Sequence, residues 1–225
     1  VYNEGNYPEA VALFQKSLKE PLDPIFTARA TFWKAESDYQ ASNFEASLVG
    51  YKQFLQLPNA SQTPEYKNSS YNLGYNYFKL KNYPEAITQY EKFLESSSND
   101  AARRNDAYLR LGDSHFVSSS YWPAMENYNK AIEGGTPDKD YAAFQKAISY
   151  GFVDRAVRKL VELKSFSAKY PKSFYRDDAL YELGNTYVSQ ENTRDAMVTY
   201  EKLINEIPGS SYVPKALLKQ ALILD

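Results

Sequence analysis

Apolar, small and aromatic residues recur along the chain at helical spacing. In the clearest copy, Gly74 is followed three residues later by Tyr77, nine residues after that by Ala86, and four residues further on by Tyr90. Side chains three and four positions apart lie on one face of an α-helix. The copy therefore predicts two helices joined by a short turn.

Four copies keep the same twelve-residue gap between the first small residue and the second. The pairs are Ala35 and Ser47, Gly74 and Ala86, Gly112 and Ala124, and Gly184 and Ala196. An asparagine–aromatic pair recurs before the second small residue, as in Asn43-Phe44 and Asn82-Tyr83. The same pair, Asn6-Tyr7, stands almost at the start of the sequence. We therefore expect the chain to start between the two helices of a repeat, as a fragment of a longer protein.

One copy departs from the pattern between Gly112 and Gly184. Ala147 is the preferred small residue there; Phe144 is the alternative, but its bulk is sterically poor for close helix packing. Ala156 follows Tyr150 after six residues instead of nine, so the turn at 151–154 is expected to be shortened by three. The first small positions then fall at residues 35, 74, 112, 147, 184 and 221, which predicts about six units.

This pattern resembles the tetratricopeptide repeat over essentially the whole chain. The resemblance implies an all-α fold, an α-solenoid or superhelix of stacked antiparallel helix pairs, as a single domain over residues 1–225. Gly74 would let the first helix approach the second, and Ala86 would lie at the matching contact. Tyr90 would wedge between units. Such units share their stability along the array.

The links after the second helices are rich in Pro, Gly, Ser and Asn, which predicts turns. They are residues 58–64, 96–99, 134–137, 170–173 and 208–211. Tyr170-Pro171-Lys172-Ser173-x-Tyr175 and Trp33-Lys34-Ala35-Glu36 resemble a variant common in bacterial cell-envelope tetratricopeptide proteins. This implies a location in the bacterial periplasm or cell envelope. A cytoplasmic location is the alternative, since a chain without cysteine suits either compartment.

The last segment, 212–225, reads as a lone first helix. Its apolar runs, Ala216-Leu217-Leu218 and Leu222-Ile223-Leu224, favour burial against a continuation of the array or against another chain. A capping helix is the alternative.

The composition excludes several kinds of metal and catalytic sites. The 225 residues include no Cys and one His, which excludes thiolate zinc sites, a Cys nucleophile and two-His metal sites. The net charge of -2 gives no general reason to bind nucleic acid. No stretch approaches the roughly 18 apolar residues of a membrane span, so no membrane insertion is expected in this segment. No metal and no cofactor are expected.

Two clusters carry residue types used in catalysis. Asp113-Ser114-His115 has the types of a nucleophilic triad, but neighbours on a helix point about 100° apart and cannot converge. Asp177-Asp178 opens a helix, where negative charge complements the helix dipole. The sequence therefore predicts that the protein is not an enzyme.

Residues 145–176 form a basic segment with eight Lys and Arg against two acidic residues. The predicted basic patch comprises Arg155, Arg158, Lys159, Lys164 and Lys169. A solvated helix face is one interpretation. Binding of an acidic partner, or of the acidic remainder of another copy, is the other.

The first helices of such an array line its concave face. A partner-binding groove would use the residues three before, one after and four after each small position, because these share a helical face. The predicted groove residues are Phe32, Glu36, Tyr39, Tyr71, Tyr75, Phe78, Leu109, Asp113, Phe116, Phe144, Ile148, Tyr181, Asn185 and Val188. Tyrosine supplies large rigid area with a polar tip, which suits interfaces, although some of these side chains are expected in the inter-repeat core.

The best-known binding mode of the tetratricopeptide family is a clamp of Lys, Arg and Asn that grips a C-terminal carboxylate. The predicted groove residues include no Lys or Arg. We therefore expect a scaffold that binds a protein or peptide on an aromatic concave face. The alternatives are a module that self-assembles as a homo-oligomer and a glycan-recognition component of a bacterial envelope system.

Overall fold

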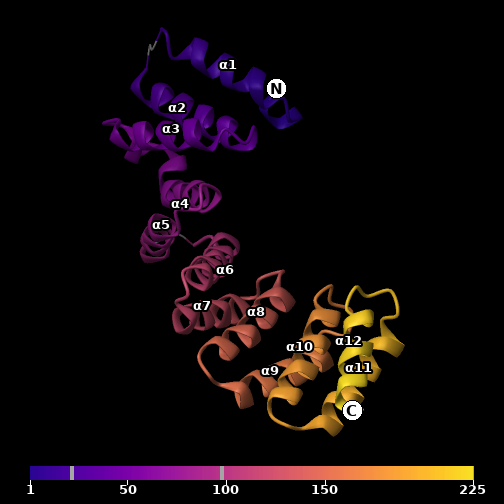
Figure 1. The fold of residues 1–225 in the computed structure, drawn as a ribbon. Coiled ribbons are helices and arrows are strands. Elements are labelled where there is room, and N and C mark those ends of the chain that lie inside the picture. The colour runs from indigo at the N-terminus through magenta and orange to yellow at the C-terminus, as the bar shows by residue number, and fades with distance from the viewer. Residues whose placement is uncertain (21–22, 97–98, 225) are drawn as a thin grey trace. The chain divides into compact units, whose positions relative to one another are not determined.

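The computed structural model describes residues 1–20, 23–96 and 99–224, and in these ranges it consists of helices joined by turns. Residues 97 and 98 of the predicted link at 96–99, and Asp225 of the last predicted helix, lie outside the described residues. The α-helices are α1 Tyr7–Ser17, α2 Pro24–Gln40, α3 Phe44–Gln56, α4 Ser69–Lys79, α5 Tyr83–Glu95, α6 Ala101–Val117, α7 Tyr121–Gly134, α8 Lys139–Phe152, α9 Ala156–Lys169, α10 Arg176–Ser189, α11 Thr193–Glu206 and α12 Val213–Leu224 (Figure 1). Short 3-10 turns occupy Tyr2–Glu4, Ala60–Gln62 and Pro64–Asn68.

The helices form two compact units, Val1–Ser118 with α1 to α6 and Ser119–Asp225 with α7 to α12. Within each unit every helix packs against the next one along the chain. Each unit has its own apolar core, the first built around Phe54, Tyr90 and Phe93, the second around Phe166, Tyr200 and Leu203. The predicted all-α class with packed neighbouring helices is confirmed. None of the helices in the described ranges combines the length and the apolar character of a membrane span.

The asparagine–aromatic pairs mark the starts of the second helices. Asn82 and Asn192 are N-cap residues whose side chains accept hydrogen bonds from the backbone N–H groups of Glu85 and Asp195. Such a side-chain oxygen satisfies a helix N–H that has no partner within the helix. The residue before each cap is left-handed, with φ of 59° at Lys81 and 57° at Glu191. This conformation reverses the chain in a single short turn.

The turn between α8 and α9 has the same geometry, so the expected shortening by three residues is wrong. Asp154 has φ of 55°, and the N–H of Arg155 donates to the carbonyl of Tyr150 at 3.0 Å. The equivalent bond runs from Asn82 to Tyr77 at 2.8 Å. Counted from the turn, Lys159 rather than Ala156 holds the second small position.

A glycine makes room for this lysine. A Cβ at Gly151 would lie 3.2 Å from Cδ of Lys159. Leu163, which is fully buried, stands where other repeats have tyrosine. Ala147 is also fully buried, which confirms it over Phe144 as the first small residue.

The glycines at the first small positions contact a tyrosine ring rather than the second small residue. A Cβ at Gly74 would lie 2.7 Å from Cδ1 of Tyr90, and a Cβ at Gly184 would lie 2.4 Å from Cε1 of Tyr200. The atoms nearest to such a Cβ at Gly74 thus belong to the ring one turn beyond Ala86 along α5. In the first repeat, Ser47 of α3 donates a hydrogen bond to the carbonyl of Ala35 at 2.7 Å.

Candidate functional site

Two of the predicted groove residues are almost fully buried, and one of them, Phe32, also lines a hollow described below. Phe32 and Leu109 are only 5% and 1% exposed. The ring of Phe32 packs against Tyr51 and Phe54 of α3, with centroids 5.4 and 5.3 Å apart. Phe32, three before Ala35, faces the second helix of its own repeat, whereas Tyr71, at the same position of the next repeat, lines a pocket. This burial agrees with the expectation that some of the predicted groove side chains lie in the core between helices.

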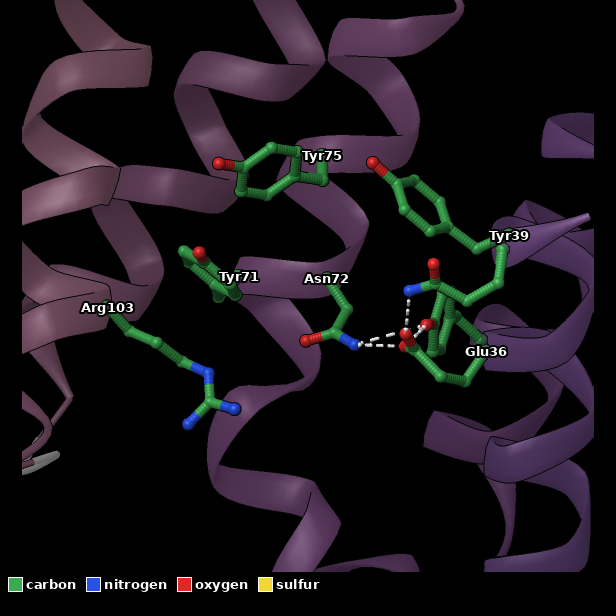
Figure 2. Close-up of a pocket in the computed structure, with 8 residues that line it drawn as sticks. Glu36, Tyr39, Tyr71, Asn72, Tyr75 and Arg103 are labelled. Atoms are coloured by element: carbon green, nitrogen blue, oxygen red, sulfur yellow. Dashed lines mark hydrogen bonds between the residues drawn. The ribbon is translucent and has the colours of Figure 1, made fainter. Parts of the chain in front are cut away.

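Four predicted residues, Glu36, Tyr39, Tyr71 and Tyr75, line one pocket of about 230 Å³ in the first unit (Figure 2). We call it the tyrosine pocket. Its lining is completed by four residues that were not predicted for the groove: Gln40, Tyr51, Asn72 and Arg103. Glu36 and Tyr39 lie on α2, Tyr71 and Tyr75 on α4. The polar and aromatic lining gives the pocket an acidic end at Glu36 and a basic end at Arg103.

Glu36 is held at its end of the pocket by hydrogen bonds from neutral groups. Its Oε2 accepts from Asn72 Nδ2 at 2.8 Å and from the Tyr51 hydroxyl. Its Oε1 accepts from Gln40 Nε2 at 2.9 Å and from the Tyr2 hydroxyl at 3.4 Å. Burial, followed by the charge of Glu36, raises the pKa of Tyr51 well above its ordinary value. Tyr51 thus stays neutral and donates.

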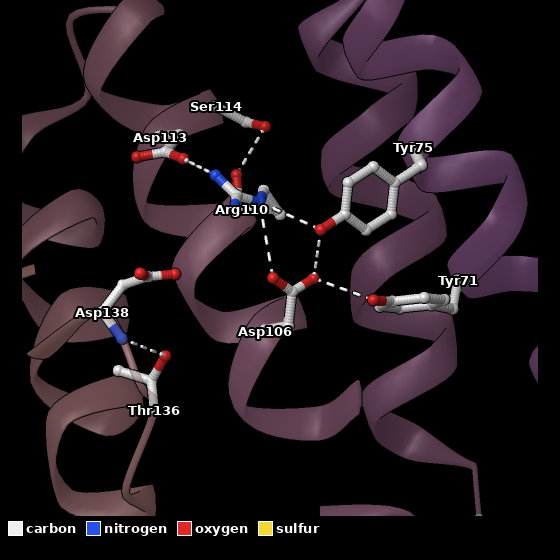
Figure 3. Close-up of polar contacts among 8 residues, drawn as sticks. All are labelled: Tyr71, Tyr75, Asp106, Arg110, Asp113, Ser114, Thr136 and Asp138. Carbon is white, nitrogen blue, oxygen red and sulfur yellow. Dashed lines mark hydrogen bonds and ion pairs between the residues drawn. The ribbon is translucent and has the colours of Figure 1, made fainter. Parts of the chain in front are cut away.

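A second network fixes Tyr71 and Tyr75 (Figure 3). Both hydroxyls donate to Oδ2 of Asp106 on α6, Tyr71 at 2.9 Å. Arg110 lies 3.5 Å from Oδ1 of Asp106 and donates to the Tyr75 hydroxyl at 3.1 Å. Burial, then the charge of Asp106, raises the pKa of Tyr75 to about 12. Burial raises the pKa of Tyr71 as well.

Asp113, another predicted groove residue, is buried and paired with Arg110 at 2.8 Å. Its carboxylate therefore belongs to the network between helices rather than to an open groove. Ser114 is fully buried and donates to the carbonyl of Arg110 at 2.7 Å. Asp113 and Ser114 do not face one another as partners in a catalytic triad would.

Arg103 enters the pocket from the first turn of α6. It pairs with Asp100, the N-cap of α6, and its guanidinium lies 5.9 Å from the ring centroid of Tyr71. Arg103 stands nine residues before the small position Gly112. From there it lies over Tyr71, which stands three residues before Gly74, the small position of the preceding repeat. The spacing of nine residues can be counted in the sequence, but the contact between Arg103 and Tyr71 is known only from the packed helices.

In the last two repeats of the second unit, the same position carries tyrosine, whereas Asp138 holds it in the repeat of Ala147. Tyr175 stacks on Phe144, with centroids 5.7 Å apart and planes 13° apart. Tyr212 stacks on Tyr181 at 4.7 Å and 23°. Phe144 and Tyr181, predicted for the groove, are thus covered by the next repeat. Asn185 accepts a hydrogen bond from the Tyr200 hydroxyl at 2.8 Å.

The other predicted groove residues do not line the tyrosine pocket. Phe78 packs edge-on against Tyr83 at 5.7 Å. Phe116, Ile148 and Val188 are half-buried.

A second hollow of about 380 Å³ shares Glu36, Asn72 and Arg103 with the tyrosine pocket. Its remaining lining comprises Tyr2, Phe32, Trp33, Pro64, Glu65 and Asn68. Glu65 accepts from Trp33 Nε1 at 3.0 Å and pairs with Arg29 at 3.0 Å. The two hollows therefore adjoin one another through three shared lining residues within the first unit.

One residue of the predicted basic patch, Lys159, is largely buried between helices. Lys159 lies 2.7 Å from Oε2 of Glu182 on α10, and its side chain is only 14% exposed. Arg155, Arg158, Lys164 and Lys169 are exposed. Lys164 lies over the ring of Tyr187 and Lys169 over that of Tyr170, at 5.1 and 5.6 Å.

Comparisons with known proteins agree with this architecture. Family models described as tetratricopeptide repeat match residues 68–100 and 178–210. Each match begins at or near a first helix and ends after the second, α4 with α5 and α10 with α11. The chain therefore contains tetratricopeptide repeats in these two stretches. No curated protein gives a significant sequence match.

Solved structures of low sequence identity share the fold. YrrB, described as a TPR protein with an unusual peptide-binding site, is 22% identical, with a TM-score of 0.68 over 92% of this chain and 97% of YrrB. RapI without ligand is 13% identical, with a TM-score of 0.78 over 96% of this chain and 64% of RapI. The segment of MamA from residue 41 to its end, from Desulfovibrio magneticus RS-1, is 15% identical, with a TM-score of 0.66 over 82% of this chain and 97% of that segment.

Proposed function

We propose that this protein is a non-catalytic scaffold that binds a peptide segment of a partner protein in the tyrosine pocket and the adjoining hollow. The observation that carries the proposal is the convergence of Tyr39, Tyr71 and Tyr75 on one half-buried pocket with polar groups at both ends. Half-buried aromatic side chains with hydroxyl tips typically anchor interfaces. The fold is shared with YrrB, a TPR protein with a peptide-binding site.

The geometry of the tyrosines favours recognition over catalysis. Asp106 accepts hydrogen bonds from two tyrosines whose pKa values are raised, so both hydroxyls are neutral and fixed in place. A fixed ring is a preorganised contact, because less rotamer freedom is lost when a partner binds.

The test is replacement of both ring anchors. The Tyr71→Ala, Tyr75→Ala protein should bind at least ~10-fold more weakly to peptides selected from a random library on the wild type, measured by fluorescence polarisation. Tyr66→Ala is the matched control, because Tyr66 is an exposed ring outside the pocket. Unchanged affinity in a double variant that keeps its helical circular dichroism would refute the proposal.

A second candidate function, self-association, is favoured by the surface of α12. Four leucines on this helix are between 51% and 77% exposed: Leu217, Leu218, Leu222 and Leu224. Such a cluster marks an interaction surface. We expect a concentration-dependent dimer in sedimentation velocity that is lost in Leu218→Ser, Leu222→Ser. Leu13→Ser, at an exposed leucine of α1, should not change it. A strict monomer at high concentration would eliminate this candidate.

For the compartment, we propose the bacterial cell envelope. The support is the resemblance of the motifs at 33–36 and 170–175 to envelope tetratricopeptide proteins. Fractionation of cells that produce the full-length protein tests it, and recovery in the cytoplasm alone would contradict it.

A further inference from the structure

The tyrosine pocket contains one carboxylate that no cation neutralises. Glu36 accepts four hydrogen bonds, all from neutral groups: Tyr2, Gln40, Tyr51 and Asn72. Within the described residues, no Lys or Arg forms an ion pair with Glu36. Neutral donors orient a carboxylate, but they leave its negative charge in place. A half-buried charge of this kind is stabilised most by a positively charged group.

The arginine of the same pocket does not supply that charge. Arg103 is paired with Asp100 and lies over the ring of Tyr71. Figure 2 shows Glu36 and Arg103 on opposite sides of Asn72. Glu65, the other carboxylate of the adjoining hollow, is already paired with Arg29. Glu36 is therefore the uncompensated charge of this surface.

The remaining lining suits a cation. The rings of Tyr71 and Tyr75 already carry the guanidinium groups of Arg103 and Arg110, each 5.9 Å from the ring centroid. The ring of Tyr39, which lines the pocket together with Glu36, is the one that would attract an added ammonium or guanidinium group. The volume of about 230 Å³ is below the roughly 300–1,000 Å³ of pockets that take whole small molecules. It matches a single long side chain inserted from a bound segment.

We infer that the tyrosine pocket binds the basic side chain, arginine or lysine, of a partner peptide, with Glu36 as its counter-charge. The inference rests on the proposed peptide-binding function and specifies what the peptide must contain. In this pocket an acidic residue of the protein binds a basic group of the partner, whereas in a carboxylate clamp basic residues of the protein bind an acidic group.

The charge preference is tested on the wild-type protein with single-residue probes. Acetyl-arginine methylamide should shift the side-chain amide signals of Asn72 and Gln40 in nitrogen-15 NMR spectra, because both amides contact Glu36. Acetyl-citrulline methylamide has nearly the same shape without the charge, and it should bind about tenfold more weakly or not at all. Equal responses to the two probes would overturn the inference without any variant.

Variants locate the counter-charge. Glu36→Gln should abolish the preference for arginine over citrulline. Glu45→Gln, which removes the same charge from an exposed site on α3 outside the pocket, should leave it unchanged. A response to acetyl-glutamate methylamide that depends on Arg103 would show that the pocket takes an acidic group, and would overturn the inference.

The outcomes separate the two proposals. If the Tyr71→Ala, Tyr75→Ala protein loses library-selected peptides while the arginine and citrulline probes bind equally, peptide binding stands and the cation preference fails. If the double variant keeps its peptides, both proposals fail together.

Discussion

Single residues set the distance between helices in each repeat. At Gly184, the ring of Tyr200 occupies the space that a side chain would fill, and at Gly74 the ring of Tyr90 does the same. The glycines therefore allow close helix packing by accommodating an aromatic ring. At the second small position of the fourth repeat, the exception is a lysine. There Lys159 reaches Glu182 of the next first helix and links two repeats by an ion pair.

Adding one methyl group at Gly184 should destabilise the second unit. A Cβ there would lie 2.4 Å from Tyr200 in a well-packed core, so Gly184→Ala should lower the free energy of unfolding by roughly 1–3 kcal/mol in urea titrations. This loss outweighs the gain of about 1 kcal/mol in helix propensity. Gly209→Ala is the control, because no atom lies within 4 Å of a Cβ there. A Gly184→Ala protein as stable as wild type would show that α10 and α11 can shift apart without cost.

Pairs of helices are joined by repeated polar links. Ser173 donates to Asp140 at 2.6 Å and Ser210 donates to Asp177 at 2.7 Å, in both cases a residue 33 positions earlier. Each serine also accepts from the N–H group two residues on, at 3.1 Å. The linking turn thereby connects the starts of successive first helices and sets the tyrosines that stack on Phe144 and Tyr181.

In the first unit, α4 and α6 are joined by tyrosine hydroxyls, which makes their contact sensitive to alkaline pH. The pKa of Tyr75 rises from 10.0 to about 12 in the folded protein. A folded pKa above the unfolded value means that the stabilisation is complete below pH 10. It is then lost as the pH rises through 12.

We therefore expect the urea midpoint to fall between pH 10 and 12, with Tyr75 contributing roughly 1 kcal/mol after solvent screening. Tyr75→Phe should flatten this dependence, and Tyr66→Phe, at an exposed ring outside the network, should not. A midpoint that stays constant across this range would disprove the role of the tyrosine network.

Across the whole molecule, the two units use the same repeat for different surfaces. In the second unit, Tyr175 and Tyr212 cover the aromatic residues of the preceding first helices. In the first unit, the equivalent positions carry Glu65 and Arg103, and hollows of about 380 and 230 Å³ adjoin them. Glu65 and Arg103 thus adjoin the candidate binding surface, whereas Asp138, at the equivalent position of the second unit, lines neither hollow.

The sequence by itself determined the all-α class, the repeat and most helix starts, because these depend on local spacing and on caps such as Asn82 and Asn192. It also singled out Glu36, Tyr39, Tyr71 and Tyr75. Only the tertiary structure decided which side chains share a pocket. Asn72, Arg103 and Asp106 lie about one repeat apart from the residues they contact, and their roles come from contacts between packed helices. Lys159 shows the same limit: a local pattern identifies a small position by size, whereas packing accepts a long side chain where Gly151 leaves room and Glu182 supplies the opposite charge.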